Sequence, residues 1–443
     1  MRARMLLVTL FLLGAGQPGW AGTEPEPAAA AQTEDSGWDD WAEEDGAEES
    51  WDEDPAWTGF VELASGSRWD RDPAVGRRTT LAELRWRLER NWALGDGRLD
   101  FRADLLGDAF ADKVDAELRE LAYGFSRGKA DFRVGRQVLT WGTGDLLFLN
   151  DLFPKGWVSF FAGRDDEYLK APSDALRMTL YTDTINLDLA VLPRFQPDEY
   201  LTGERLSFFS PQAKAVIAPE PPLSAHEPSA SLGNTEWALR LFKNVNGNEL
   251  ALYAFDGFYH QPAPAGPAGA LAFPRLRTLG ASWRRTLGSG IFNLEASRHE
   301  SRDDANGSNP AVPNGQLRLL AGYEWEAVAN LTVALQLYLE RTLDHEALLA
   351  NSPWPQSEVA ENRIWLTNRL SWRTRQDRVV WSLFSFYSAT DHDAYLRPRV
   401  TWRASDAWQF TAGANLFTGD EPHTFFAQFE DNSNVYARIR YSY

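Results

Sequence analysis

The fold is decided by the stretch Asn434-Val435-Tyr436-Ala437-Arg438-Ile439-Arg440-Tyr441-Ser442-Tyr443. Apolar or aromatic side chains alternate with polar ones in this stretch, and a period of two is typical of a β-strand with one apolar and one polar face. Its length, about ten residues, is also that of a tilted strand that crosses a bilayer. A soluble β-sandwich strand could carry the same pattern, so the rest of the chain has to decide between the two.

The same alternation recurs through residues 57–443. In residues 82–89, for example, Ala82, Leu84, Trp86 and Leu88 alternate with charged residues. Read along the chain, the pattern predicts about eighteen strands, near 57–69, 79–91, 97–107, 114–126, 130–139, 174–182, 184–192, 234–243, 248–259, 275–287, 290–299, 315–327, 330–341, 362–374, 378–388, 395–404, 407–417 and 434–443.

The connections between the predicted strands alternate strictly in length. Short turns that carry Gly, Asn or Asp, such as 93–96 and 244–247, suit hairpins. Longer segments, including 140–173, 193–233 and 342–361, lie between them. Short turns at one end and long loops at the other are typical of outer-membrane barrels. The sequence therefore predicts an all-β fold, a transmembrane antiparallel up-and-down β-barrel of about 18 strands with both termini on the short-turn, periplasmic side.

Two further regions precede the predicted strands. Residues 1–21 have the pattern of a secretory signal peptide, because Arg2 and Arg4 precede an apolar stretch and small residues allow cleavage after Ala21. Residues 22–56 contain fourteen Asp or Glu and no Lys or Arg, so they carry most of the formal net charge of −19. Such a composition cannot bury a core, and we expect a disordered acidic periplasmic tail. Its three tryptophans are a candidate docking motif, and a solubilising linker is the alternative.

If the apolar face of the strands meets lipid, the other face lines a lumen. That face is dense in charge, which is tolerated only in water or in paired networks. Arginine dominates several strands that would be neighbours in the closed barrel, so one wall could attract anions. Neighbouring carboxylates could equally neutralise this wall through salt bridges. The candidate pore-lining residues are Glu83, Arg85, Arg87, Arg98, Arg102, Glu340, Arg363, Arg369, Arg373, Arg397, Arg399, Arg403, Arg438 and Arg440.

The segment 140–173 is long and unusually apolar for an exposed loop. A loop with its own apolar run usually folds onto something, so we predict that it folds inward and narrows the lumen, with packing over the barrel mouth as the alternative. Its acidic residues could bind Ca²⁺, although a solvated acidic turn is the simpler interpretation. The candidate constriction residues are Trp141, Asp145, Asp151, Asp165, Asp166 and Glu167.

No catalytic or cofactor-binding motif stands out in the sequence. We find no Gly-x-Ser-x-Gly, no His-Glu-x-x-His and no phosphate-binding Gly-rich loop. With no cysteine, the chain has no thiolate metal ligand and no covalent haem site. The six histidines match no metal-ligand spacing. We therefore predict that the protein is not an enzyme and has neither a cofactor nor a metal site. The alternatives are a barrel hydrolase, in which Ser and His converge from distant strands, and a histidine metal site at the barrel mouth.

Several short motifs carry a resemblance to a known family. They are Gly135-Arg136-Gln137-Val138 with Trp141-Gly142, then Leu396-Arg397-Pro398, Phe417-x-Gly419-Asp420 and Phe429-x-Asp431-Asn432. These residues resemble signatures of porin-like, mostly uncharacterised proteobacterial outer-membrane proteins. Tyr443 likewise resembles the terminal aromatic residue of Gram-negative outer-membrane barrels. The resemblance implies an outer-membrane barrel with a transport-like role, and it does not identify a solute.

Two hypotheses of function follow. The first is a channel in the outer membrane of a Gram-negative bacterium, which passes small polar solutes, with anions as one candidate class. The second is a scaffold whose acidic segment, 22–56, docks a periplasmic partner such as a redox protein. The expected partners are outer-membrane lipids and, at the C-terminal strand, the barrel assembly machinery. No nucleic acid partner is expected.

Overall fold

The computed structural model describes residues 56–443, so the predictions for 1–21 and 22–55 lie outside the described residues. Eighteen long strands form one sheet, and each of their ends lies within three residues of its predicted position. The strands are β1 Thr58–Arg68, β2 Thr79–Leu94, β3 Gly97–Asp108, β4 Lys113–Arg127, β5 Ala130–Val138, β6 Pro172–Leu180, β7 Asn186–Leu192, β11 Glu236–Val245, β12 Asn248–Phe258, β14 Arg275–Leu287, β15 Gly290–Ser301, β16 Gln316–Val328, β17 Leu331–Thr342, β18 Asn362–Thr374, β19 Val379–Ser388, β20 Asp393–Arg403, β21 Trp408–Gly419 and β22 Asn434–Ser442.

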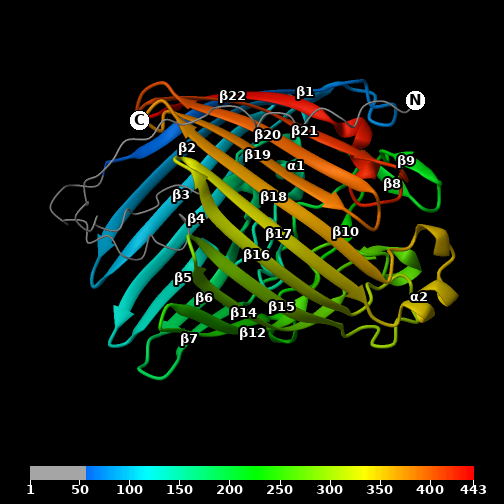
Figure 1. The fold of residues 1–443 in the computed structure, drawn as a ribbon, viewed down its shortest axis with the longest axis horizontal. Coiled ribbons are helices and arrows are strands. Elements are labelled where there is room, and N and C mark those ends of the chain that lie inside the picture. Colours follow the sequence, from blue (N-terminus) through cyan, green and yellow to red (C-terminus); the bar gives the residue numbers. More distant parts are fainter. Residues whose placement is uncertain (1–55) are drawn as a thin grey trace, which may run out of the picture. The chain divides into compact units, whose positions relative to one another are not determined.

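The sheet closes on itself (Figure 1). Each of these strands pairs antiparallel with the long strands before and after it in the chain, and β1 pairs with β22. In this closing pair Leu63 lies opposite Ile439, and Phe60 lies opposite Ser442. The predicted fold, a closed antiparallel barrel of eighteen strands, is therefore confirmed.

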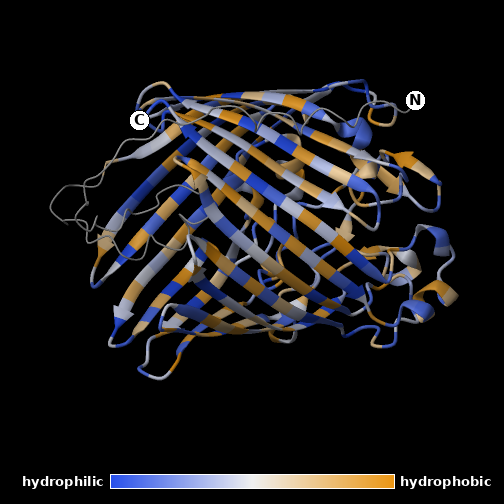
Figure 2. Ribbon diagram, viewed as in Figure 1, coloured by the Kyte–Doolittle hydropathy of each residue, from blue (hydrophilic) through white to orange (hydrophobic). Residues whose placement is uncertain are grey.

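Side chains alternate across the barrel wall because successive residues of a strand point to opposite faces. Figure 2 shows the alternation as orange and blue bands along the strands. In β22 the side chains of Val435 and Ile439 are exposed, whereas Tyr436 and Arg438 are buried. Exposed Leu and Trp side chains recur on the other long strands as well. The apolar face is therefore the outer face of the wall, and the charged face is the inner one.

One end of the barrel carries the short turns, together with the first residues of β1 and the last residues of β22. Asn246 and Gly247, with φ of 52° and 74°, join β11 to β12 in the left-handed conformation that two-residue hairpins favour. The other end carries the long loops, with two exceptions at 109–112 and 389–392. The predicted strict alternation in length is wrong there, because about four residues suffice to join neighbouring antiparallel strands.

The long loops contain the remaining secondary structure. Figure 1 shows α2 and the β8–β9 hairpin at the end of the barrel opposite the C-terminus. No helix among residues 56–443 is long and apolar enough to cross a membrane. These elements are α1 Trp157–Ala162, η1 Asp166–Leu169, β8 Phe208–Ser210, β9 Ala215–Ile217, β10 Ala225–His226, η2 Leu232–Asn234, η3 Pro267–Gly269, β13 Leu271–Ala272, α2 His345–Asn351, η4 Pro355–Ser357 and η5 Ala427–Asn432.

Candidate functional site

The internal loop, residues 139–171 between β5 and β6, lies against the inner face of the barrel at two places. Near its start, Trp141 contacts Tyr253 of β12, with ring centroids 6.2 Å apart. Near its end, the carbonyl oxygen of Phe161 accepts hydrogen bonds from Asn415 of β21 and Asn434 of β22, at 3.0 and 3.1 Å. Strands β12 and β22 are about half the sheet apart. The loop therefore crosses the lumen from one wall to the other.

The apolar anchor is the contact of Trp141 and Phe153 with Tyr253 and its neighbours. The ring centroids of Trp141 and Phe153 lie 5.1 Å apart, and both side chains are buried. The indole nitrogen of Trp141 donates a hydrogen bond to Asp188 of β7 at 3.2 Å. Asn150 donates to Glu295 of β15 at 2.9 Å. Aromatic packing and hydrogen bonds thus hold the first part of the loop against the wall.

The ionic anchor consists of Asp165, Asp166 and Glu167 at the start of η1, with the arginines that surround them. Asp165 pairs with Arg438 at 2.7 Å and with Arg440 at 3.3 Å. Asp166 pairs with Arg397 at 2.5 Å and with Arg399 at 2.6 Å. Glu167 pairs with Arg87 of β2 at 2.5 Å. Three consecutive loop carboxylates therefore contact β2, β20 and β22.

The surroundings of these carboxylates keep them ionised. Burial by itself would raise the pKa of Asp165, but the guanidinium charges of Arg438 and Arg440 outweigh burial and hold that pKa well below its usual range. The pKa of Asp166 is lowered in the same way, with burial opposed by Arg397 and Arg399. The pKa of Glu167 is also lowered, with burial opposed mainly by Arg87. The ionic anchor is therefore a set of charged pairs at neutral pH.

The wall beside the ionic anchor contains a second network, between β2 and β3. Arg85 and Arg87 donate to Asp104 at 2.8 and 2.7 Å. The hydroxyl of Tyr168, which belongs to the internal loop, donates to the same carboxylate at 2.8 Å. Glu83 pairs with Arg164 of the loop at 2.8 Å. Predicted residues on β2 and loop residues thus share one hydrogen-bond network.

The remaining wall, from β16 to β18, holds further paired charges. Arg363 pairs with Glu340 at 2.7 Å, and Arg318 approaches the same carboxylate at 3.4 Å. Arg369 pairs with Asp145 of the internal loop at 2.5 Å. The structure therefore brings most of the predicted arginines next to carboxylates. This is the second of the two arrangements that the sequence allowed, in which salt bridges neutralise the arginine wall.

Four predicted arginines lie closer to the short-turn end. Arg98 follows the turn between β2 and β3, pairs with Asp100 and keeps 43% of its side chain exposed. Arg102 lies 3.2 Å from Glu89. Arg373 and Arg403 lie at the ends of β18 and β20.

Asp151, a predicted constriction residue, pairs with Lys155 of the same loop at 2.9 Å, and both side chains are buried. Among residues 56–443, no group of His, Cys, Asp and Glu has the geometry of a metal site, and Asp165, Asp166 and Glu167 face arginines. The alternatives of a Ca²⁺ site and of a solvated acidic turn are therefore wrong for these three carboxylates, because arginine nitrogens are their partners.

Several residues of the site were not singled out from the sequence. Glu62 of β1 accepts a hydrogen bond from Arg440 at 2.9 Å, and its position on the inner face followed from the period of two in that strand. Lys155 stands four residues after Asp151, but this segment is not helical, so the spacing did not indicate the pair. Nothing in the sequence pointed to Tyr168, whose role depends on how the internal loop folds.

The motif that carries the family resemblance lies where β5 enters the internal loop. Gly135 has a φ of 129°, and a Cβ atom there would lie 2.1 Å from the carbonyl oxygen of Leu121 on β4. Arg136 pairs with Asp174 of β6 at 3.0 Å. Gln137 donates to the carbonyl oxygen of Ala175 at 3.2 Å. These residues fix the pairing of β4, β5 and β6 at the point where the loop turns inward.

Comparisons with known proteins give the class of fold. No family model matches the chain, and no curated protein matches it. Among the solved structures that match, three have a TM-score of 0.52 over 88% of this chain. OccD3 (OpdP) of Pseudomonas aeruginosa is 8% identical and covered over 91% of its length, and OccAB2 of Acinetobacter baumannii is 10% identical and covered over 98%. OccK2 (OpdF) of Pseudomonas aeruginosa, solved in complex with glucuronate, is 11% identical and covered over 97%.

These three proteins are outer-membrane porins. At identities of 8 to 11% the likeness concerns the fold. The chain therefore has the barrel fold of outer-membrane porins.

Proposed function

We propose that the protein is an outer-membrane channel of a Gram-negative bacterium that passes small polar solutes, with its short turns and its C-terminal strand on the periplasmic side. An apolar outer face with a charged inner face supports this proposal, because only a water-filled lumen or a paired network tolerates such charge. The fold of known porins supports it as well. We place the chain in the porin-like family whose motifs it resembles, and we expect the barrel assembly machinery to recognise β22.

We infer further that the channel prefers anions and that the internal loop narrows it. Arg399 carries this inference. It donates to Asp166 at 2.6 Å, yet 24% of its side chain remains exposed. A guanidinium has five N–H donors, and the pair with Asp166 uses few of them. A solute carboxylate or phosphate that reached Arg399 would therefore find donors in a suitable geometry.

The conductance of purified protein in planar bilayers tests the channel. We expect discrete conductance steps, and in a KCl gradient we expect a reversal potential that favours chloride. The substitution Arg399→Gln should shift the reversal potential toward the potassium side because it removes a lumen cation. Arg285→Gln is the matched control, since Arg285 lies exposed near the short turn of β14 and shares the parity of outward-facing Leu279.

Replacement of residues 143–168 by a short Gly-Ser linker tests whether the internal loop narrows the channel. We expect a larger conductance, because the segment that crosses the lumen is then absent. Retention of the folded barrel is checked by its mobility in unheated electrophoresis samples. If a folded barrel shows no conductance with or without this segment, the channel proposal is wrong.

The second candidate function is the scaffold that captures a periplasmic partner. The fourteen carboxylates of residues 22–56 favour the scaffold, because diffusion of solutes through a channel does not require an acidic segment. Periplasmic extract should yield a specific protein on immobilised full-length chain, but not on a variant without residues 22–56. Equal capture by both variants would exclude the scaffold and leave the channel unaffected.

A further inference from the structure

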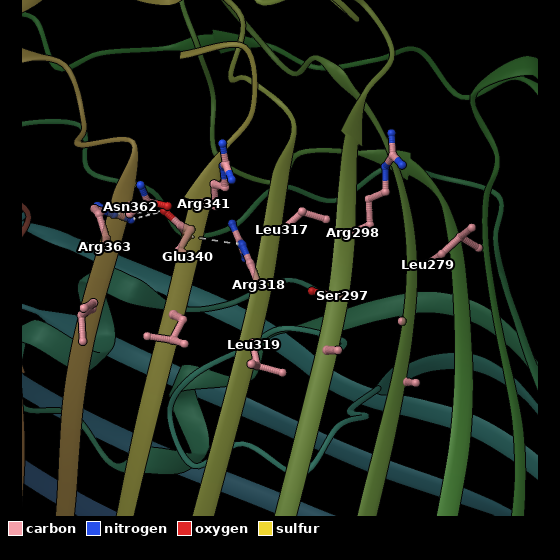
Figure 3. Close-up of a pocket in the computed structure, with 15 residues that line it drawn as sticks. Leu279, Ser297, Arg298, Leu317, Arg318, Leu319, Glu340, Arg341, Asn362 and Arg363 are labelled. Carbon is pink, nitrogen blue, oxygen red and sulfur yellow. Dashed lines mark hydrogen bonds and ion pairs between the residues drawn. The ribbon is translucent and has the colours of Figure 1, made fainter. Parts of the chain in front are cut away.

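A shallow groove lies on the outer face of the barrel wall between β14 and β18, at the long-loop end (Figure 3). Its volume is about 720 Å³. Ala281 and Ala296 lie opposite each other in neighbouring strands and form its floor, because their small side chains leave space. Leu279 and Leu319 flank this pair and are exposed on the outer face. The floor of the groove is therefore apolar.

Two arginines, Arg298 and Arg341, lie at the long-loop side of this groove (Figure 3). Arg298 is exposed, and its cross-strand neighbours Leu279 and Leu317 are exposed leucines. The nearby outward arginines Arg277 and Arg302 pair with Asp256, whereas Arg298 has no ion pair within residues 56–443. Arg341 pairs at 2.9 Å with Glu361, and its side chain is 60% exposed. The groove thus presents outward-facing guanidinium groups above an apolar floor.

Arg318, Glu340 and Arg363 also line the groove, but their charged groups pair with one another. Arg318 and Arg363 contact Glu340, as the dashed lines in Figure 3 show. Along β15, Arg298 lies between the buried Ser297 and His299. Along β17, Arg341 follows the buried Glu340. Arg298 and Arg341 therefore point to the opposite side of the wall. The lumen network therefore does not neutralise them.

An arginine on the outer face of a membrane barrel is unfavourable unless its charge meets water or an anion. The planar fork of its N–H donors matches the oxygens of a phosphate group. The apolar floor below Arg298 matches an acyl chain, which gains free energy when it leaves water. Only a molecule with both parts uses the arginines and the floor together.

We propose that this groove binds an acylated, phosphorylated amphiphile of the outer leaflet, with a phosphate at Arg298 and Arg341 and an acyl chain over Ala281 and Ala296. The proposal rests on the membrane location given above, and it does not depend on solute transport. Two simpler ligands would each use only part of the groove. Inorganic phosphate lacks the acyl chain, and a dephosphorylated lipid lacks the anion.

Native mass spectrometry of the full chain in detergent tests the proposal with three probes: bisphosphorylated lipid A, the same lipid without phosphates, and inorganic phosphate. We expect stable retention of bisphosphorylated lipid A alone. The double substitution Arg298→Gln, Arg341→Gln should weaken this binding by about tenfold or more, since two charge-assisted contacts to phosphate are lost. Ala296→Trp should also weaken it, because the indole fills the floor of the groove.

Arg285→Gln is the control, because it removes an exposed arginine from the opposite end of β14. It should leave lipid retention unchanged. Equal retention by wild-type protein and both groove variants would overturn the proposal, and so would equal losses in the groove variants and in the control. Conductance of the groove variants, measured in parallel, should equal that of the wild type, so failure of the lipid site and failure of the channel are separate outcomes.

Discussion

The apolar anchor and the ionic anchor hold one loop in two different ways. At the first, Trp141 packs between Phe153 and Tyr253, and such contacts depend little on pH or salt. At the second, Asp165 and Asp166 each face arginines of the wall, and their attraction depends on charge. The comparison teaches that pH and salt should act more strongly on the ionic anchor than on the apolar anchor, where aromatic packing predominates.

The substitution Trp141→Ala breaks the apolar anchor and should have the largest effect. Removal of a buried tryptophan side chain leaves a cavity and costs about 3–5 kcal/mol. Hydrogen exchange measured by mass spectrometry should show faster exchange in residues 140–153, with a smaller change in residues 164–170. Trp381→Ala is the control, since this side chain is 50% exposed on β19. If hydrogen exchange of residues 140–153 were equally faster in Trp381→Ala, the conclusion that Trp141 anchors the loop would be wrong.

The substitution Asp166→Asn breaks the ionic anchor instead. It leaves Arg397, whose side chain is buried, without its carboxylate, and an unpaired buried charge costs about 3 kcal/mol or more. Exchange should now accelerate in residues 164–170 and change little in 140–153. Asp183→Asn, at a carboxylate that is 97% exposed, should change neither segment. Faster exchange confined to 140–153 would reverse the assignment of the two anchors.

Acid should loosen the ionic anchor selectively. The ordinary pKa values are 3.8 for Asp and 4.5 for Glu, and the folded-state pKa values of Asp165, Asp166 and Glu167 are lowered. A carboxylate whose pKa is lowered in the folded state stabilises that state fully above its ordinary pKa. This stabilisation is lost as the pH falls through the folded-state pKa. Exchange of residues 164–170, corrected for the intrinsic rate, should therefore begin to accelerate only below about pH 4. Residues 140–153 serve for comparison, and a smaller acceleration is expected there because aromatic packing holds that segment alongside the pair of Asp145 with Arg369. Equal acceleration of exchange in both segments would contradict the distinction between the two anchors.

Of the three substitutions in the internal loop, Glu167→Gln should have the smallest effect. Its partner Arg87 keeps Asp104, to which it donates at 2.7 Å, so no buried charge is left alone. A loss of about 1 kcal/mol is expected, as for one ordinary hydrogen bond. Hydrogen exchange of residues 164–170 in the two variants measures this loss: the acceleration in Glu167→Gln should be smaller than that in Asp166→Asn. An effect as large as that of Asp166→Asn would show that Asp104 does not support Arg87.

The sequence allowed the barrel to be predicted because the period of two is local. The strands at 275–287 and 362–374 were predicted without error, and Arg438 and Arg440 were placed on the inner face by alternation alone. The end of β2 was predicted at residue 91 and lies at Leu94, because pairing with β3 continues until Leu94 lies opposite Gly97. Such boundaries depend on hairpin geometry, which a local pattern specifies poorly.

The candidate site was less predictable because its pairs join distant segments. Asp165 and Arg438 are brought together only by the path of the internal loop, and no local pattern encodes that path. Alternation could place Arg397 on the inner face but could not show that Asp166 would pair with it. Arg298 could have been found from the sequence, since the same alternation puts it between leucines on the outer face.

The seam between β1 and β22 has a consequence for how the molecule forms. Its hydrogen bonds join segments from the two ends of the described chain, so neither strand has its final neighbour until the intervening strands are arranged. Contacts of such long sequence separation form slowly, because the entropy of closing a large loop must be overcome first. Until that moment β1 and β22 each expose an unpaired edge that any other strand can join. The barrel is therefore most prone to aggregate in the interval before its seam closes, when shielding of these two edges decides between a closed barrel and an aggregate.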